Sequence, residues 1–119
     1  MIKMIIQMNN EKLLRNPEFT KDQINAVLNK IFTQMGMTRV DTDRGTEYCG
    51  HNHPSDFARF GKIMLGLKNQ KWFMNNVQEW ILCNSDDSDD PEDFDEEDLL
   101  AHYARIAEKF LAQIKTSFH

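Results

Sequence analysis

The residues best suited to chemistry lie together at Cys49-Gly50-His51-Asn52-His53. A thiolate and two imidazoles at two-residue spacing would share one side of an extended strand, and zinc accepts this ligand set. Cys83 or His102 would complete a tetrahedral site. Structural zinc sites are usually built from two separated pairs such as C-x₂-C and H-x₃-H, and the sequence contains no such pair. We therefore favour ordinary loop histidines and a buried thiol, and keep a small zinc-binding protein as the weaker alternative.

The same segment is a poor candidate for a nucleophile. A catalytic Cys–His pair needs a third group that orients the base. The pattern around Cys49, His51 and His53 offers none, and no G-x-S-x-G motif, phosphate-binding Gly-rich loop or dinucleotide fingerprint is present. We predict no catalytic residues, no resident metal and no cofactor, and a protein that is not an enzyme.

An acidic run dominates the charge of the chain. Between Asp86 and Asp98, ten of thirteen residues are acidic and none is Lys or Arg. The whole chain carries −5, whereas the remainder without this run would carry +5. Such blocks are usually solvated linkers. This one lies between two apolar stretches that both require burial, so we interpret it as a fixed negative patch. Its sign excludes direct nucleic-acid binding and predicts a basic partner.

The acidic run does not fit a calcium loop. Positions 1, 3, 5 and 12 of an EF-hand would fall on Asp86, Ser88, Asp90 and Glu97. Pro91 then replaces the Gly that position 6 requires. The distal half of the run has instead the pattern of a helix start, with Asp95 as the N-cap and with Phe94 and Leu99 as a hydrophobic staple.

Length and composition predict one domain. The chain has 119 residues, of which 40% are hydrophobic and 28% charged, as in a globular protein with one modest core. No apolar run reaches the roughly 20 residues of a membrane span. The N-terminal segment lacks a basic region and a cleavage site, so we expect no signal peptide, a cytoplasmic location and two free thiols.

Apolar spacing predicts helices in the first third of the chain. Residues 1–14 fit a helix bent at Asn9-Asn10 and ended by Asn16-Pro17, although Ile5-Ile6 would equally open a strand. The clearest helix begins at a capping box formed by Thr20 and Gln23, and Gly36 ends it.

The rest of the chain continues this pattern. Residues 37–54 contain Gly45, Gly50 and Pro54 without a helical period, which predicts an irregular connection with short extended pieces at residues 37–40 and 46–49. Further helices are predicted at residues 54–67, 72–81 and 96–115. The predicted fold is mainly all-α, a single domain of residues 1–119 formed by a compact bundle of four to five amphipathic helices, with an acidic loop at residues 84–94.

Two adjoining stretches carry a family resemblance. They are W-F-M-N-N-V-Q-E-W-I-L (Trp72–Leu82) and N-S-D-D-S-D-D-P-E-D-F-D-E-E-D-L-L-A-H-Y (Asn84–Tyr103). Together they resemble small bacterial immunity proteins of contact-dependent growth inhibition and related polymorphic toxin systems. The resemblance implies a cytoplasmic binding protein that neutralises a cognate toxin domain, commonly a nuclease, by covering its active site or substrate cleft.

The acidic patch agrees with that implication. A nuclease needs a basic cleft for phosphates, and a fixed negative patch would compete for that cleft and speed association. We expect no membrane partner. The residues predicted to face the toxin are Asp86, Asp87, Asp89, Asp90, Glu92, Asp93, Glu96 and Glu97, with Phe94 and Tyr103 as aromatic anchors. The alternative is a phage- or plasmid-borne inhibitor that mimics nucleic acid to block a host nuclease or defence complex.

Overall fold

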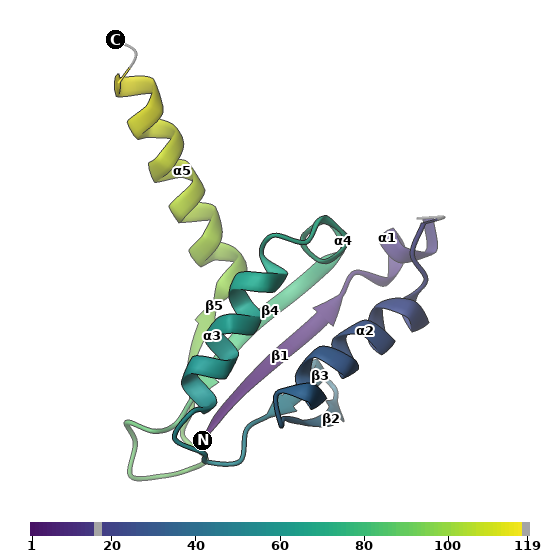
Figure 1. The fold of residues 1–119 in the computed structure, drawn as a ribbon, viewed down its shortest axis with the longest axis vertical. Coiled ribbons are helices and arrows are strands. Elements are labelled where there is room, and N and C mark those ends of the chain that lie inside the picture. Colours follow the sequence, from purple (N-terminus) through teal and green to yellow (C-terminus); the bar gives the residue numbers. More distant parts are fainter. Residues whose placement is uncertain (16–17, 118–119) are drawn as a thin grey trace.

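A five-stranded antiparallel sheet forms the frame of the molecule in the computed structural model, which describes residues 1–15 and 18–117 (Figure 1). The strand order is β2-β3-β1-β4-β5. Along the chain the elements are β1 (Ile2–Met8), α1 (Asn10–Arg15), α2 (Lys21–Gln34), β2 (Thr38–Thr42), β3 (Gly45–Cys49), α3 (Asp56–Leu67), α4 (Lys71–Met74), β4 (Val77–Asn84), β5 (Asp95–Asp98) and α5 (Leu99–Ser117). The fold mixes helices with a sheet, so the prediction of an all-α helical bundle is wrong.

The central strand β1 explains the first error. It pairs with β3 on one side and with β4 on the other, and its alternate residues Ile2, Met4, Ile6 and Met8 join the main core. Ile5, between two of them, is also buried, on the opposite face of the sheet. Consecutive buried residues hide the two-residue period of a strand, so the pattern admitted a helix.

Helix α1 starts at the predicted bend in residues 1–14. Asn9 stands directly before it, and its side-chain oxygen accepts the backbone N–H of Lys12 at 3.2 Å. This contact satisfies one of the free N–H groups of the first turn. The predicted helix end at Asn16-Pro17 lies outside the described residues.

The predicted helix at residues 72–81 is a short helix followed by a strand. Only α4 is helical, and β4 then runs antiparallel to β1. Trp80 and Leu82 join the core on one face of β4, whereas the buried Cys83 lies on the other face. Because residues on both faces are removed from water, the apolar run does not alternate and resembles a buried helix.

The predicted irregular connection at residues 37–54 contains the β2–β3 hairpin. Its two strands include the short extended pieces expected there except Met37, which precedes β2. Gly45 follows the turn with φ +127°, and a Cβ at this position would lie 2.7 Å from the carbonyl oxygen of Ile6. Only glycine combines this backbone conformation with so close an approach to β1.

The clearest predicted helix is confirmed. The Thr20 side chain accepts the backbone N–H of Gln23 at 3.2 Å, and the Gln23 side chain accepts the backbone N–H of Thr20 at 3.0 Å. α3 also lies within its predicted range of residues 54–67. In both helices the local spacing of apolar residues predicts the element.

Helices α2 and α3 cover one face of the sheet, which we call the helix face (Figure 1). There the Phe32 ring stacks on Tyr48 with 3.9 Å between centroids. Trp80 is fully buried and donates its indole N–H to the Met4 sulfur at 3.1 Å. Each fully buried side chain of this size contributes about 1.5–3 kcal/mol. We call the other face of the sheet the open face.

The loop before α3 winds around a buried carboxylate. Asp56 Oδ2 accepts the backbone N–H of His51 at 3.0 Å and that of His53 at 3.1 Å. Gly50 passes so close that a Cβ there would lie 2.5 Å from the same oxygen. Asp56 therefore fixes the path of the chain between β3 and α3.

Asp56→Ala should lower the free energy of unfolding by about 2–4 kcal/mol, because two backbone N–H groups lose their charged acceptor. Urea unfolding followed by Trp fluorescence measures this change. Asp56→Asn keeps an acceptor oxygen and should cost less. Asp43→Ala, on the exposed hairpin turn, is the matched control and should change stability by less than about 0.5 kcal/mol. A stability of Asp56→Ala equal to that of the wild type would contradict this role.

Candidate partner-binding surface

The acidic loop lies where the sequence places it, but it joins β4 to β5 and not two helices. Residues 95–98, predicted to open the last helix, form β5. α5 starts at Leu99, and Asp98 Oδ1 accepts the backbone N–H of Ala101 at 3.2 Å. Asp98, not Asp95, therefore caps the helix. The six carboxylate residues of the loop are all exposed, namely Asp86, Asp87, Asp89, Asp90, Glu92 and Asp93.

Short polar side chains hold the backbone of the acidic loop. Ser88 Oγ accepts the backbone N–H of Asp90 at 3.2 Å and donates to Asp93 Oδ2 at 3.1 Å. Asp90 Oδ1 in turn accepts the backbone N–H of Glu92 at 2.9 Å. Such bonds imitate backbone turns. Asp86 takes no part in them and pairs with the Met1 ammonium instead, which leaves the carboxylates of Asp87, Asp89 and Glu92.

Both ends of the acidic loop are tied to the N-terminal end of the chain, one to Met1 and the other to Lys3 of β1. Ser85 is buried and donates its backbone N–H to the Met1 carbonyl at 3.0 Å, and the Met1 ammonium pairs with the Asp86 carboxylate. At the other end, Lys3 Nζ lies 4.4 Å from the centroid of the Phe94 ring. The predicted anchor Phe94 is therefore half-buried against the body of the protein.

The other predicted contact residues follow the loop, on β5 and in α5. Glu96 forms two hydrogen bonds with Arg44, at 2.8 and 3.0 Å, while Glu97 lies 3.3 Å from His102 Nδ1. The half-buried Tyr103 ring stacks on Trp80 with 5.5 Å between centroids. All three side chains make contacts within the chain, although Glu96 and Glu97 stay exposed beside the acidic loop.

Ion pairs cover part of the open face, and they were not predicted from the sequence. Lys3 Nζ lies 2.7 Å from Glu47 on the neighbouring strand β3. Arg44, at the β2–β3 turn, reaches across to Glu96 on the far edge strand. Ile5 lies between them and is only 1% exposed. The hint in the sequence is Lys3, which interrupts the apolar residues at positions 1–6.

Cys49 and Cys83 flank Lys3 on the open face. They pair with Lys3 from the two strands beside β1, so about 10 Å separates their backbones, too far for a disulfide. Burial raises the pKa of Cys49 and raises the pKa of Cys83 to about 11. Both thiols are therefore protonated at neutral pH and are weak nucleophiles.

The two histidines of the zinc alternative are bonded within their own region. His51 Nε2 lies 2.7 Å from the Thr38 hydroxyl, and His53 Nδ1 accepts the backbone N–H of Ser55 at 3.0 Å. Within residues 1–15 and 18–117, no three His, Cys, Asp or Glu side chains form a group that could hold a metal ion. Cys49, His51 and His53 thus do not make a zinc site in this part of the chain.

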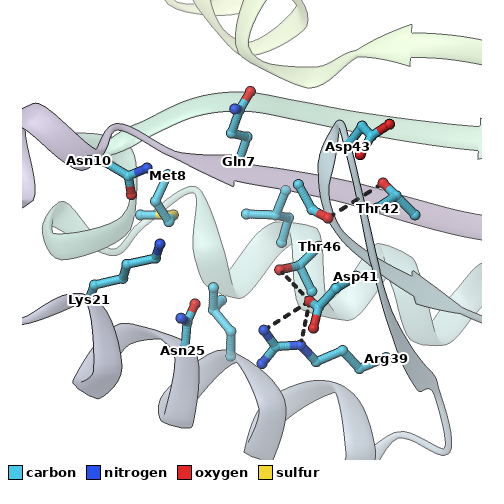
Figure 2. A pocket seen from close by; sticks show the side chains of 13 residues that line it. Gln7, Met8, Asn10, Lys21, Asn25, Arg39, Asp41, Thr42, Asp43 and Thr46 are labelled. Atoms are coloured by element: carbon cyan, nitrogen blue, oxygen red, sulfur yellow. Dashed lines mark hydrogen bonds and ion pairs between the residues drawn. The ribbon is translucent and has the colours of Figure 1, made fainter.

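A polar pocket of about 370 Å³ lies between α2 and the β2–β3 hairpin (Figure 2). Arg39 closes one side, with its guanidinium 3.0 Å from Asp41 and 2.9 Å from Asn29 Oδ1. Lys21 and Asn25 line the pocket from α2. No His or Cys is among the lining residues, so the pocket contains neither a thiol nucleophile nor an imidazole base. The contacts of Arg39 hold the hairpin against α2.

Arg44→Ala should raise the pKa of Glu96 toward its ordinary value, because the two hydrogen bonds from Arg44 hold that pKa down. The folded pKa lies below the unfolded one, so the ion pair stabilises the fold above the ordinary pKa of 4.5 and loses this contribution as the pH falls through the folded value. Both side chains are nearly half exposed, which limits the effect at neutral pH to about 1 kcal/mol or less.

Carboxyl NMR titration of Glu96 and urea unfolding at neutral and acidic pH measure these two effects. Arg105→Ala, on the exposed part of α5, is the matched control and should leave the Glu96 titration unchanged. Identical titration of Glu96 in wild type and Arg44→Ala would show that the pair is not formed in solution.

Comparisons with known proteins found no match for this chain. It matches no family model, and no curated protein and no solved structure is detectably similar to it. Among the residues that the structure describes, no helix has both the length and the apolar character of a membrane span. Function must therefore be argued from the acidic loop and the surfaces around it.

Proposed function

We propose that this chain is an immunity protein, not an enzyme, that binds and neutralises a cognate bacterial toxin domain with nuclease activity. One observation carries the proposal. Six exposed carboxylates lie on a single loop whose backbone is held by its own hydrogen bonds and whose two ends are tied to Met1 and to Lys3 of β1. Such a loop presents its charge in one orientation.

The fixed backbone favours tight binding. A loop that already has its bound shape loses little conformational entropy when a partner arrives. The cleft of a nuclease carries basic residues that attract phosphates, and the acidic loop would occupy the same positions. Attraction between the two surfaces would also raise the association rate well above that of neutral partners.

The carboxylates of the loop divide into two roles in this proposal. Asp90 and Asp93 orient the loop through bonds with Glu92 and Ser88, and Asp86 does so through its pair with the Met1 ammonium. The unengaged carboxylates would contact the basic side chains of the toxin, and they belong to Asp87, Asp89 and Glu92. Binding would take place in the cytoplasm, where a nuclease finds its substrate, and would involve no membrane.

Reversing the three unengaged charges tests the proposal. Asp87→Lys, Asp89→Lys and Glu92→Lys together leave the hydrogen bonds of Ser88 and Asp90 in place. Tagged wild-type and variant chains are used to capture binding proteins from the organism that encodes them, and the captured protein is purified and assayed for nuclease activity. The wild type should inhibit it at equimolar ratio, and the variant should bind at least about 100-fold more weakly, since close charge pairs are each coupled by more than about 1.5 kcal/mol.

A control with the same change in net charge separates the loop from general electrostatics. Glu11→Lys, Asp22→Lys and Glu108→Lys together alter three exposed helix positions and should bind like the wild type. Equal affinity of the loop variant and the wild type would contradict the proposal. Recovery of a host DNA-binding complex in place of a toxin fragment would favour the nucleic-acid mimic.

A further inference from the structure

The last helix projects from the body of the protein (Figure 1). Its first turn is packed, since Leu99 is fully buried and Tyr103 stacks on Trp80. Beyond Tyr103, residues 104–115 are exposed. At about 1.5 Å per residue, this exposed part of α5 is about 18 Å long.

The apolar stripe of α5 does not end where the packing ends. Ile106, Phe110 and Leu111 continue it at three- and four-residue spacing and are 49%, 61% and 57% exposed. An amphipathic helix normally buries such a face. Nothing in the described part of the chain covers this one.

The helix layer carries an apolar groove of matching length. Two adjoining hollows of about 480 and 470 Å³ share Val27 and Trp72, and the first runs between α2 and α3. Ile31, Met35 and Leu67 are also part of its lining. Along α2 the apolar lining extends from Ile24 to Met35, which spans about 17 Å. Val27 is 45% exposed, so the groove is open to a partner.

We propose that residues 104–115 of α5 from one copy of this chain dock into the α2–α3 groove of a second copy, and that the exchange is reciprocal. α5 is one continuous helix that starts beside Trp80 and runs away from the body, so it does not reach its own groove (Figure 1). The second copy supplies both missing parts, an apolar helix for the groove and a groove for the helix. The arrangement is a closed two-fold dimer, in which the same two surfaces serve both copies.

The size of the contact agrees with a stable dimer. An 18 Å length of helix about 10 Å across removes on the order of 400 Å² from water on each of the four contributing surfaces, or about 1,600 Å² in total. That total is the standard size of a specific protein interface. The acidic loop lies at the opposite end of the molecule from the tip of α5, so both surfaces can act at once (Figure 1).

Two single substitutions test the exchange by sedimentation equilibrium of the full chain. Wild type should have twice the 14.0 kDa mass of the monomer. Phe110→Asp on the helix and Val27→Asp in the groove should each weaken self-association by about 100-fold or more, as expected for apolar residues at the centre of an interface. Both positions are exposed in the monomer, and circular dichroism verifies that each variant is folded. Lys109→Asp, on the polar side of α5, is the control and should dimerise like the wild type.

Mixing the two variants gives the sharper test. Phe110→Asp keeps an intact groove and Val27→Asp keeps an intact α5, so one of the two contacts forms only in the mixture. The mixture should associate more strongly than either variant alone. Monomeric wild type, a mixture no stronger than its components, or dimeric Val27→Asp beside monomeric Phe110→Asp would each overturn the proposal, the last because α5 would then pair with another surface.

Discussion

The structure depends on the burial of both faces of β1, although helices cover only one face of the sheet. β1 is the middle strand of five, and Ile5 is as well buried on the open face as Met4 is on the helix face. The helix face is covered by apolar packing. On the open face, Ile5 lies among Lys3, Arg44 and Phe94. Lys3 pairs with Glu47 on the neighbouring strand β3, and Arg44 pairs with Glu96 on the far edge strand β5.

This solution also decides where the acidic loop lies. Lys3 pairs with Glu47 while its ammonium lies over the Phe94 ring, so the exit of the loop is fixed by the residue that covers the open face. The entry is fixed by Ser85 bonded to Met1. The carboxylates between these points repel one another, and an untied loop would spread them apart. The contacts with Met1 and Lys3 therefore hold the negative surface of the loop in a defined shape.

Local features of the structure were predictable from the sequence, and features that need distant contacts were not. The capping box of α2 and the position of the acidic loop depend on neighbouring residues. The strands β1 and β4 were misjudged because burial on both faces removes the alternation that identifies a strand. Arg44 and Glu96 lie 52 positions apart in the sequence, and no local pattern joins them. The helix cap was predicted at Asp95, three residues before the observed cap at Asp98, because the acidic residues 95–98 form β5.

The two candidate interaction surfaces use different physics and so respond differently to solution conditions. The proposed binding by the acidic loop is electrostatic between exposed groups, and salt screens such attraction over about 10 Å at 0.1 M. Docking of α5 buries apolar side chains, which salts such as sulfate strengthen. Raising the salt concentration should therefore release the proposed basic partner while leaving the proposed dimer intact. Because the two associations respond to salt in opposite ways, each can be measured separately in one preparation of the protein.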